Sequence, residues 1–96
     1  MTPSEALNRH RASVRCIVEA HKARNPRVFG SVARGQDTDR SDLDLLIDTT
    51  SQTSLFDIAD LELELEKLLG VQVHVTTDGS LRGPIRDRIF AEAHQV

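Results

Sequence analysis

The chain has 96 residues, of which 39% are hydrophobic and 28% are charged, and its formal net charge is −3. This composition is typical of one soluble globular domain over residues 1–96, and the acidic balance argues against strong non-specific binding of nucleic acid. The absence of Trp and Tyr argues against recognition by stacked bases. A single Cys excludes an intrachain disulfide, and no apolar run approaches the ~18 residues of a membrane span, so a cytoplasmic location is expected.

The first predicted element is a helix over residues 4–24, because apolar side chains recur there at helical spacing. Ser4 is its expected N-cap, and Asn25-Pro26 is its expected stop. Cys16 should lie in this helix as a small buried hydrophobic residue. The basic residues of this region are expected to solvate a helix face rather than to form a polyanion site: Arg9, Arg11, Arg15, Lys22, Arg24 and Arg27.

Two strands and a polar loop are predicted next. Residues 27–29 form a short strand that runs into Gly30-Ser31, and a helical turn over 32–35 ends at a glycine. A polar loop over 36–41 leads to a strand in which Leu43, Leu45 and Ile47 alternate with acidic residues.

The second half of the chain predicts helix, strand and helix. A capping box at Ser54 and Asp57 begins a helix that Gly70 ends. A strand over 71–77 follows, and Pro84 begins the last helix. The expected fold is therefore α+β, a two-layer arrangement in the order α-β-α-β-α-β-α around a small mixed sheet of about three strands.

Asp42 and Asp44 lie two residues apart on a strand, so both side chains leave the same face. Two carboxylates held this close would repel each other unless a cation sits between them. Mg²⁺ suits this position, because it takes one or two carboxylates and completes its shell with water and phosphate oxygens. For the pair alone, a solvated Asp-x-Asp on an edge strand is the favoured interpretation.

Gly30 and Ser31 strengthen the metal interpretation. A glycine after a strand lets the backbone approach a ligand closely, and a serine at the mouth of a short helix suits phosphate. An ordinary strand-to-helix turn with a capping serine is the alternative for this pair. Taken together, Gly30-Ser31 and Asp42-x-Asp44 describe a phosphate cradle that faces a metal site, as phosphoryl or nucleotidyl transfer requires.

The spacing of Gly30-Ser31 and Asp42-x-Asp44 resembles the signature of the DNA polymerase beta-like nucleotidyltransferases. The flanking stretches RVFGSVARG and SDLDLLID resemble the minimal nucleotidyltransferase (MNT) branch, and the likeness extends over nearly the whole chain. The resemblance implies an antitoxin that transfers AMP from ATP to a tyrosine of a HEPN-domain ribonuclease toxin. It implies that Gly30 and Ser31 hold the triphosphate and that Asp42 and Asp44 bind Mg²⁺. Arg34 would contact phosphate, or it would close the turn as a surface residue.

The third carboxylate of the family is replaced in this chain. Its position on the strand after the long helix falls on His74, whose side chain should point away from the valine face toward the site. Imidazole can accept a proton near neutral pH but is a poor ligand for Mg²⁺. Three interpretations follow: active chemistry with His74 as the base, nucleotide binding without catalysis, or a polar residue with no role.

The functional hypotheses differ accordingly. The first is an AMP-transferring antitoxin, and the second is an antitoxin that acts by binding alone. The third is the catalytic half of a two-part nucleotidyltransferase for RNA ends or a small molecule. A partner protein must supply substrate recognition. Leu61, Leu63 and Phe90 are candidates for an apolar surface that docks this partner, or they pack on neighbouring helices.

Overall fold

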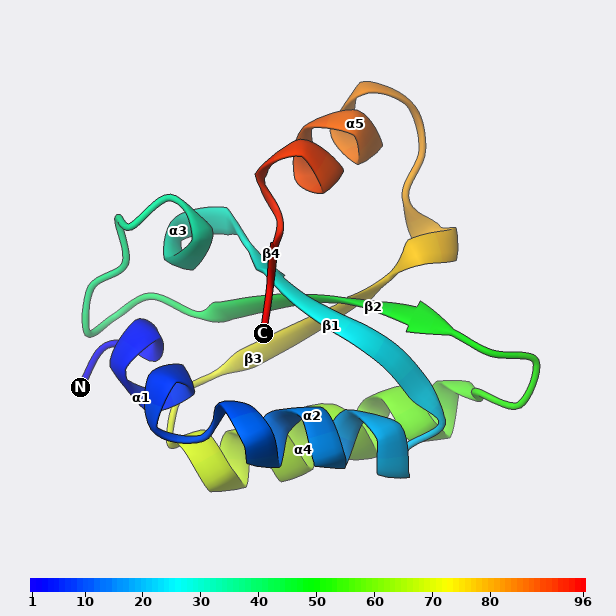
Figure 1. Cartoon of the computed structure of the whole chain (residues 1–96), viewed down its shortest axis with the longest axis horizontal. Helices are drawn as coiled ribbons and strands as arrows, with labels where there is room; N and C mark the ends of the chain where they lie inside the picture. The colour runs from blue at the N-terminus through cyan, green and yellow to red at the C-terminus, as the bar shows by residue number, and fades with distance from the viewer.

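A four-stranded sheet in the order β3-β2-β1-β4 organises the computed structural model, which describes all 96 residues (Figure 1). Its strands are β1 (Ala23–Phe29), β2 (Leu43–Thr49), β3 (Val73–Thr77) and β4 (His94–Gln95). Strand β1 pairs antiparallel with β2 and β4, whereas β2 pairs parallel with β3. The mixed sheet confirms the predicted α+β class. The prediction of three strands missed β4, a two-residue strand that exists only through its pairing with β1.

The helices divide between the two sides of the sheet (Figure 1). On one side lie α1 (Pro3–Arg9), α2 (Arg11–Ala20) and α4 (Leu55–Leu69); on the other lie the short α3 (Gly30–Ala33), the 3-10 turn η1 (Asp78–Ser80) and α5 (Gly83–Glu92). No helix is long and apolar enough to cross a membrane.

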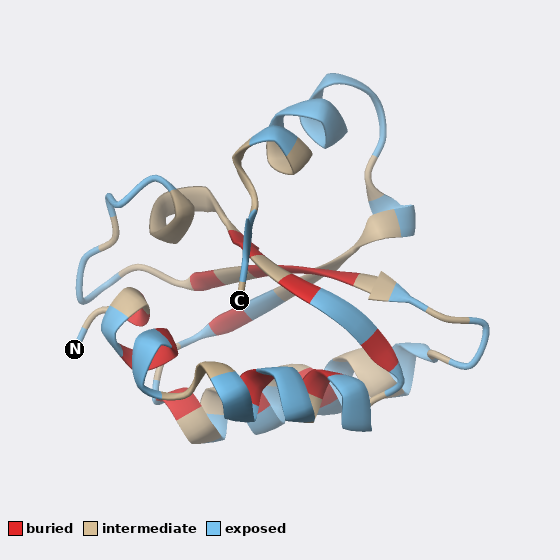
Figure 2. Cartoon of the chain, in the orientation of Figure 1, coloured by how far each residue is buried: buried red, intermediate tan, exposed pale blue.

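The hydrophobic core lies between the sheet and the layer of α1, α2 and α4, where the buried residues face one another (Figure 2). Leu43, Leu45 and Ile47 of β2 belong to this core, as their alternation predicts. Their neighbours Asp44 and Asp48 therefore point to the opposite side of the sheet, toward α5. The sheet face opposite the core thus carries acidic side chains beside Leu46, which is also fully buried.

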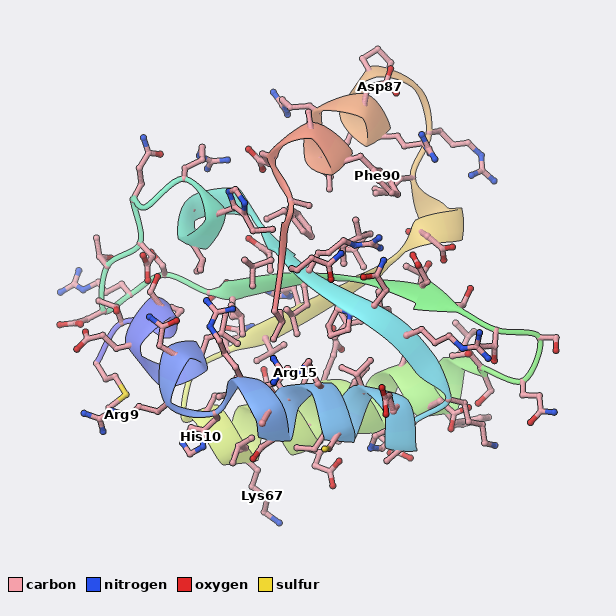
Figure 3. The ribbon with its side chains drawn as sticks, in the orientation of Figure 1. Arg9, His10, Arg15, Lys67, Asp87 and Phe90 are labelled. Carbon is pink, nitrogen blue, oxygen red and sulfur yellow. The ribbon has the colours of Figure 1, made fainter.

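Helix α5 differs from the other long helices because it has no buried residue. Phe90 of this helix makes two cation–π contacts, with the Arg86 guanidinium 4.4 Å and the Arg27 guanidinium 5.4 Å from its ring centroid. Figure 3 shows Phe90 on the side of α5 that faces the sheet and Asp87 on the outer side. Phe90 is therefore partly covered by cations of its own chain.

The predicted helix over residues 4–24 is wrong in its bounds. His10 is non-helical, with φ −133° and ψ 22°, and separates α1 from α2. The N-cap is Thr2, which forms a capping box with Glu5. Ser4 instead donates from its hydroxyl to Asp37 at 2.7 Å and from its N–H at 2.9 Å, which ties α1 to the loop before β2.

The end of the first helical region also differs from the prediction. Lys22 has φ 64° and turns the chain into β1 before Asn25-Pro26 is reached. Asn25, with φ 54°, lies inside β1, where the register with β2 shifts between Arg24 and Arg27. Such a bulge accommodates Pro26 because its position needs no ladder hydrogen bond.

Cys16 is exposed on α2, contrary to the expectation of burial. Val14 and Val18 fill the core face of that helix, so Cys16 falls on the solvent face. Helix α4 confirms its predicted ends, because Ser54 and Asp57 form the capping box and Gly70 adopts φ 70° as the C-cap.

Leu61 is fully buried in the core, so its assignment to a docking surface is wrong, whereas Leu63 is 65% exposed. Leu61→Ala should therefore lower the free energy of unfolding by about 2–5 kcal/mol, because it leaves a cavity. Leu63→Ala, two residues along the same helix, should change it by less than about 0.5 kcal/mol. Urea unfolding of both variants checks the difference, and equal losses would contradict this core.

Candidate active site

Gly30, Asp44 and His74 come together because of the sheet register. Asp44 pairs with Phe29 across the antiparallel β1–β2 ladder and with His74 across the parallel β2–β3 ladder. Gly30 follows Phe29 directly and begins α3. The motif residues that the sequence predicts to act together therefore meet across three adjacent strands, on the sheet face opposite the core.

The backbone of Gly30 touches the carboxylate of Asp44. Gly30 has φ +71°, and a Cβ built on it would lie 2.5 Å from Asp44 Oδ2, closer than real Cβ contacts occur. Both the backbone conformation and the lack of space exclude a side chain at this position. The glycine predicted to permit a close backbone approach thus makes room for Asp44.

Asp42 and His74 form a contact at the edge of the same site. His74 Nε2 lies 3.0 Å from Asp42 Oδ2, and both side chains are about half exposed, at 51% and 41%. An ionised carboxylate only accepts hydrogen bonds, so Nε2 is the donor and Nδ1 of a neutral imidazole keeps a free lone pair. His74 can therefore position Asp42 and still accept a proton.

Asp44 has an environment that disfavours its charge. Burial raises its pKa above the ordinary value; the positive charge of a protonated His74 opposes the rise, and the nearby Asp42 carboxylate adds to it. A cation bound between Asp42 and Asp44 would remove this penalty. The donor set fits Mg²⁺, which accepts two carboxylates when phosphate and water supply its other ligands. The chain has no group of three or more His, Cys, Asp or Glu residues that could hold a metal by itself.

The other predicted phosphate contacts lie at the start and end of α3. Ser31 is the second residue of α3 and half-buried, and its carbonyl accepts the Gln36 N–H at 2.9 Å. Arg34 is the C-cap of the helix, and its side chain turns toward α5. The roles of Ser31 and Arg34 in phosphate binding remain predictions.

Glu92 of α5 occupies the position next to these groups, and sequence reasoning did not single it out. Its Oε1 accepts the Gly30 N–H at 2.9 Å, and its Oε1 and Oε2 lie 3.3 and 3.1 Å from Arg34 Nη1. The Gly30 hydrogen bond and, to a smaller extent, Arg34 hold the pKa of Glu92 below its usual range despite partial burial. Because these partners lie 62 and 58 residues away in the chain, no local pattern signals the contact.

A pocket of about 510 Å³ opens beside this contact. Its lining combines the end of β1, α3 and the last turns of α5: Phe29, Gly30, Arg34, Arg88, Ile89 and Glu92. Two cationic side chains in this lining suit an anionic ligand.

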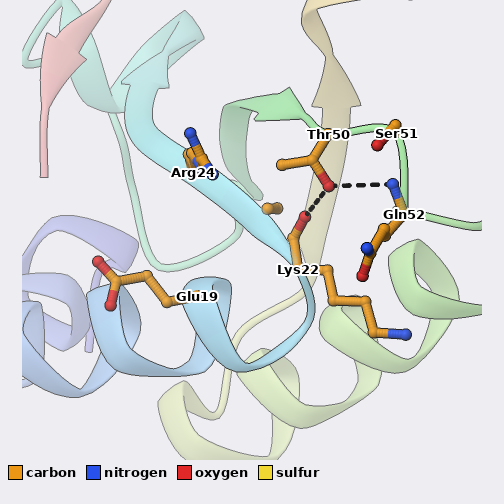
Figure 4. A pocket seen from close by; sticks show the side chains of 7 residues that line it. Glu19, Lys22, Arg24, Thr50, Ser51 and Gln52 are labelled. Carbon is orange, nitrogen blue, oxygen red and sulfur yellow. Dashed lines mark hydrogen bonds between the residues drawn. The ribbon is translucent and has the colours of Figure 1, made fainter.

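Another pocket, of about 470 Å³, lies at the opposite end of β1 (Figure 4). Here the Lys22 carbonyl accepts the Thr50 hydroxyl at 3.1 Å, and Thr50 Oγ1 accepts the Gln52 N–H at 3.2 Å. These bonds join the start of β1 to the loop after β2. None of the predicted site residues lines this pocket, so the Gly30–Asp44 region remains the candidate active site.

The basic residues near the N-terminus do not gather into one site. Arg11 and Arg15 donate to the backbone carbonyls of Gln95 and Val96 at 3.4 and 3.0 Å, and Arg27 pairs with Asp48 at 2.7 Å. Arg9 and Arg15 project from different helices in Figure 3. Several of these cations therefore have intramolecular partners, beyond the solvent role expected from the sequence.

Residues 15–95 match the sequence model of the family described as nucleotidyltransferase domain. The chain therefore belongs to the nucleotidyltransferase domain family, which confirms the resemblance inferred from Gly30-Ser31 and Asp42-x-Asp44.

The chain is also similar to individual nucleotidyltransferases. The chain is 35% identical over 91 residues to the protein adenylyltransferase MntA of Thermococcus cleftensis, covering 86% of this chain and 92% of that protein. A solved structure of a candidate minimal nucleotidyltransferase is 40% identical and superposes with a TM-score of 0.88 over 97% of this chain and 95% of the other. A crystal structure of a toxin–antitoxin with AMP-PNP, 17% identical, shares the fold with a TM-score of 0.72 over 83% of this chain and 66% of the other.

Proposed function

We propose that this chain is an antitoxin that transfers AMP from ATP to a tyrosine hydroxyl of a HEPN-type ribonuclease toxin. The observation that carries the proposal is the meeting of Gly30, Asp44 and His74 across three strands, with Asp42 beside His74. The name of the Thermococcus cleftensis relative supports protein adenylylation. A structure with the same fold is a toxin–antitoxin with AMP-PNP, which supports a toxin as the partner and an adenine nucleotide as the ligand.

In this proposal the site has two halves. Asp42 and Asp44 hold Mg²⁺, which when bound neutralises charge on the phosphates. Gly30, Ser31 and Arg34 hold the triphosphate through backbone N–H, hydroxyl and guanidinium groups. Because α3 and the side chains of Asp44 and His74 lie on the α5 side of the sheet, the toxin must present its tyrosine from that side.

The transfer step requires a proton acceptor. The tyrosine oxygen forms a bond to the α-phosphorus of ATP while the bond from that phosphorus to the bridging oxygen breaks, and pyrophosphate leaves. The hydroxyl proton passes to Nδ1 of His74, whose Nε2–H is held by Asp42.

The proposal is tested by incubating the chain with its HEPN partner and Mg²⁺–ATP and measuring the intact mass of the partner. We expect an increase equal to one or more AMP units, which chelation of the metal prevents. A partner whose mass is unchanged, but whose ribonuclease activity is still inhibited, would favour an antitoxin that acts by binding alone. The replacement of the third carboxylate by His74 is the observation that favours this second candidate.

Substitutions of His74 distinguish an antitoxin that transfers AMP from one that acts by binding alone. His74→Ala should lower AMP transfer about 100-fold or more, because the base is lost, while the ATP-dependent rise in melting temperature persists. His94→Ala, an exposed histidine on β4, is the matched control and should transfer normally. Faster transfer by His74→Asp would show instead that His74 only fills the place of a lost carboxylate.

A further inference from the structure

We infer that the Glu92 carboxylate is an internal competitor of the nucleotide, occupying the phosphate-binding position until the triphosphate displaces it. This inference rests on the proposed function, because Gly30 and Arg34 are among the residues proposed to hold the triphosphate. It adds a regulatory residue that lies outside the family motif and comes from the last turn of α5.

The contacts of Glu92 are those that a bound phosphate oxygen would make. Its Oε1 accepts the Gly30 N–H at 2.9 Å, and its Oε2 accepts a hydrogen bond from Arg34 Nη1 at 3.1 Å. An N–H beside a guanidinium is a charge-assisted anion site, and carboxylate and phosphate are its two common occupants. Two anions cannot share these donors without strong repulsion, so binding of the triphosphate requires Glu92 to leave.

The charges around Glu92 allow the triphosphate to replace its carboxylate. Arg88 lines the same pocket and its charge acts on Glu92, so two arginines remain for the nucleotide once Glu92 has moved.

Glu92 can leave this position by rotation of its side chain, whereas hydrogen bonds to β1 fix the backbone that follows it. Residues of β4 pair with Arg27 and Val28 of β1, and the Val96 N–H donates to the Pro26 carbonyl at 3.0 Å. The Glu92 side chain has three rotatable bonds and is 22% exposed, so it can swing toward solvent without moving this strand.

Glu92→Gln should therefore bind Mg²⁺–ATP about 5- to 30-fold more tightly, because the neutral amide competes less well for the cradle. Inorganic triphosphate should show the same gain, since the competition concerns phosphate and not the base. Glu92→Asp, which keeps the charge but shortens the side chain, should also gain affinity. Asp87→Asn removes one negative charge from the outer side of the same helix and should stay within about twofold of the wild type.

Calorimetric titration of the four proteins with both ligands measures these affinities, and the Gly30 amide resonance reports the contact before any nucleotide is added. We expect that resonance to move upfield in Glu92→Gln and to be unaffected by Asp87→Asn. Equal or weaker binding by folded Glu92→Gln, or an unmoved Gly30 resonance, would overturn the competitor role while leaving the proposed function intact. If neither the wild type nor Glu92→Gln binds either ligand, the nucleotide site is refuted together with its competitor.

Discussion

Asp44→Asn is expected to abolish the rise in melting temperature caused by Mg²⁺–ATP and to lower AMP transfer at least about 100-fold. The substitution keeps the shape of the side chain but removes the anionic oxygen that would bind the metal. Thermal unfolding with and without Mg²⁺–ATP, and the intact mass of the partner, measure the two effects. Asp60→Asn, an exposed acid on α4, is the control for loss of one negative charge.

The same substitution should leave the unliganded protein as stable as the wild type or more stable at pH 7. The native pKa of Asp44 is raised above the ordinary 3.8, so the folded state binds this proton more tightly than the unfolded state. The contribution of Asp44 to stability therefore decreases as the pH rises from the ordinary pKa of 3.8 through the raised native pKa. At neutral pH the ionised group costs stability. An Asp44→Asn protein that unfolds far more easily would show that Asp44 is structural, and a preserved ligand shift would place the nucleotide elsewhere.

Gly30→Ala is expected to eliminate nucleotide binding as well as to destabilise the fold. Alanine at φ +71° costs about 1–2 kcal/mol, and its Cβ would push the Asp44 carboxylate out of place. Gly35→Ala is the matched control, because Gly35 has φ +69° but nothing lies within 4 Å of the position that a Cβ would take.

Comparing Gly30→Ala with Gly35→Ala distinguishes the effect of backbone strain from the effect of displacing Asp44. By urea titration Gly35→Ala should lose the free energy of backbone strain alone and Gly30→Ala should lose at least as much, whereas only Gly30→Ala should lose the Mg²⁺–ATP shift. If Gly30→Ala binds Mg²⁺–ATP as well as Gly35→Ala does, the close approach of Gly30 to Asp44 has no functional role.

The elements that the sequence predicted correctly depend on neighbouring residues. Helix α4 begins and ends as expected because Ser54, Asp57 and Gly70 form local caps. The alternation of β2 placed Asp44 opposite the core for the same reason, and the strand parity of β3 placed His74 on the same face. The geometry behind the metal and base hypotheses was thus accessible from residue order.

The features that the sequence did not predict depend on distant partners. Ser4 is no N-cap because its hydroxyl bonds to Asp37, 33 residues away. Strand β4 needs the edge of β1, and the position of Glu92 at Gly30 needs the whole path of α5 around the sheet. Helical spacing also failed to distinguish the buried Leu61 from the exposed Leu63, because α4 packs through only part of its apolar surface.

The lack of any buried residue in α5 has a consequence for the order in which the fold loosens. A segment with few buried apolar contacts opens locally at a lower free energy than the core does. The first turns of α5 can therefore unravel and re-form while β1, β2 and β3 stay intact, and only the end beside Glu92 is held by β4. One wall of the candidate active site therefore opens at a lower free energy than the sheet beneath it, and a partner that docks on α5 would reshape that wall without disturbing the strands that carry Asp44 and His74.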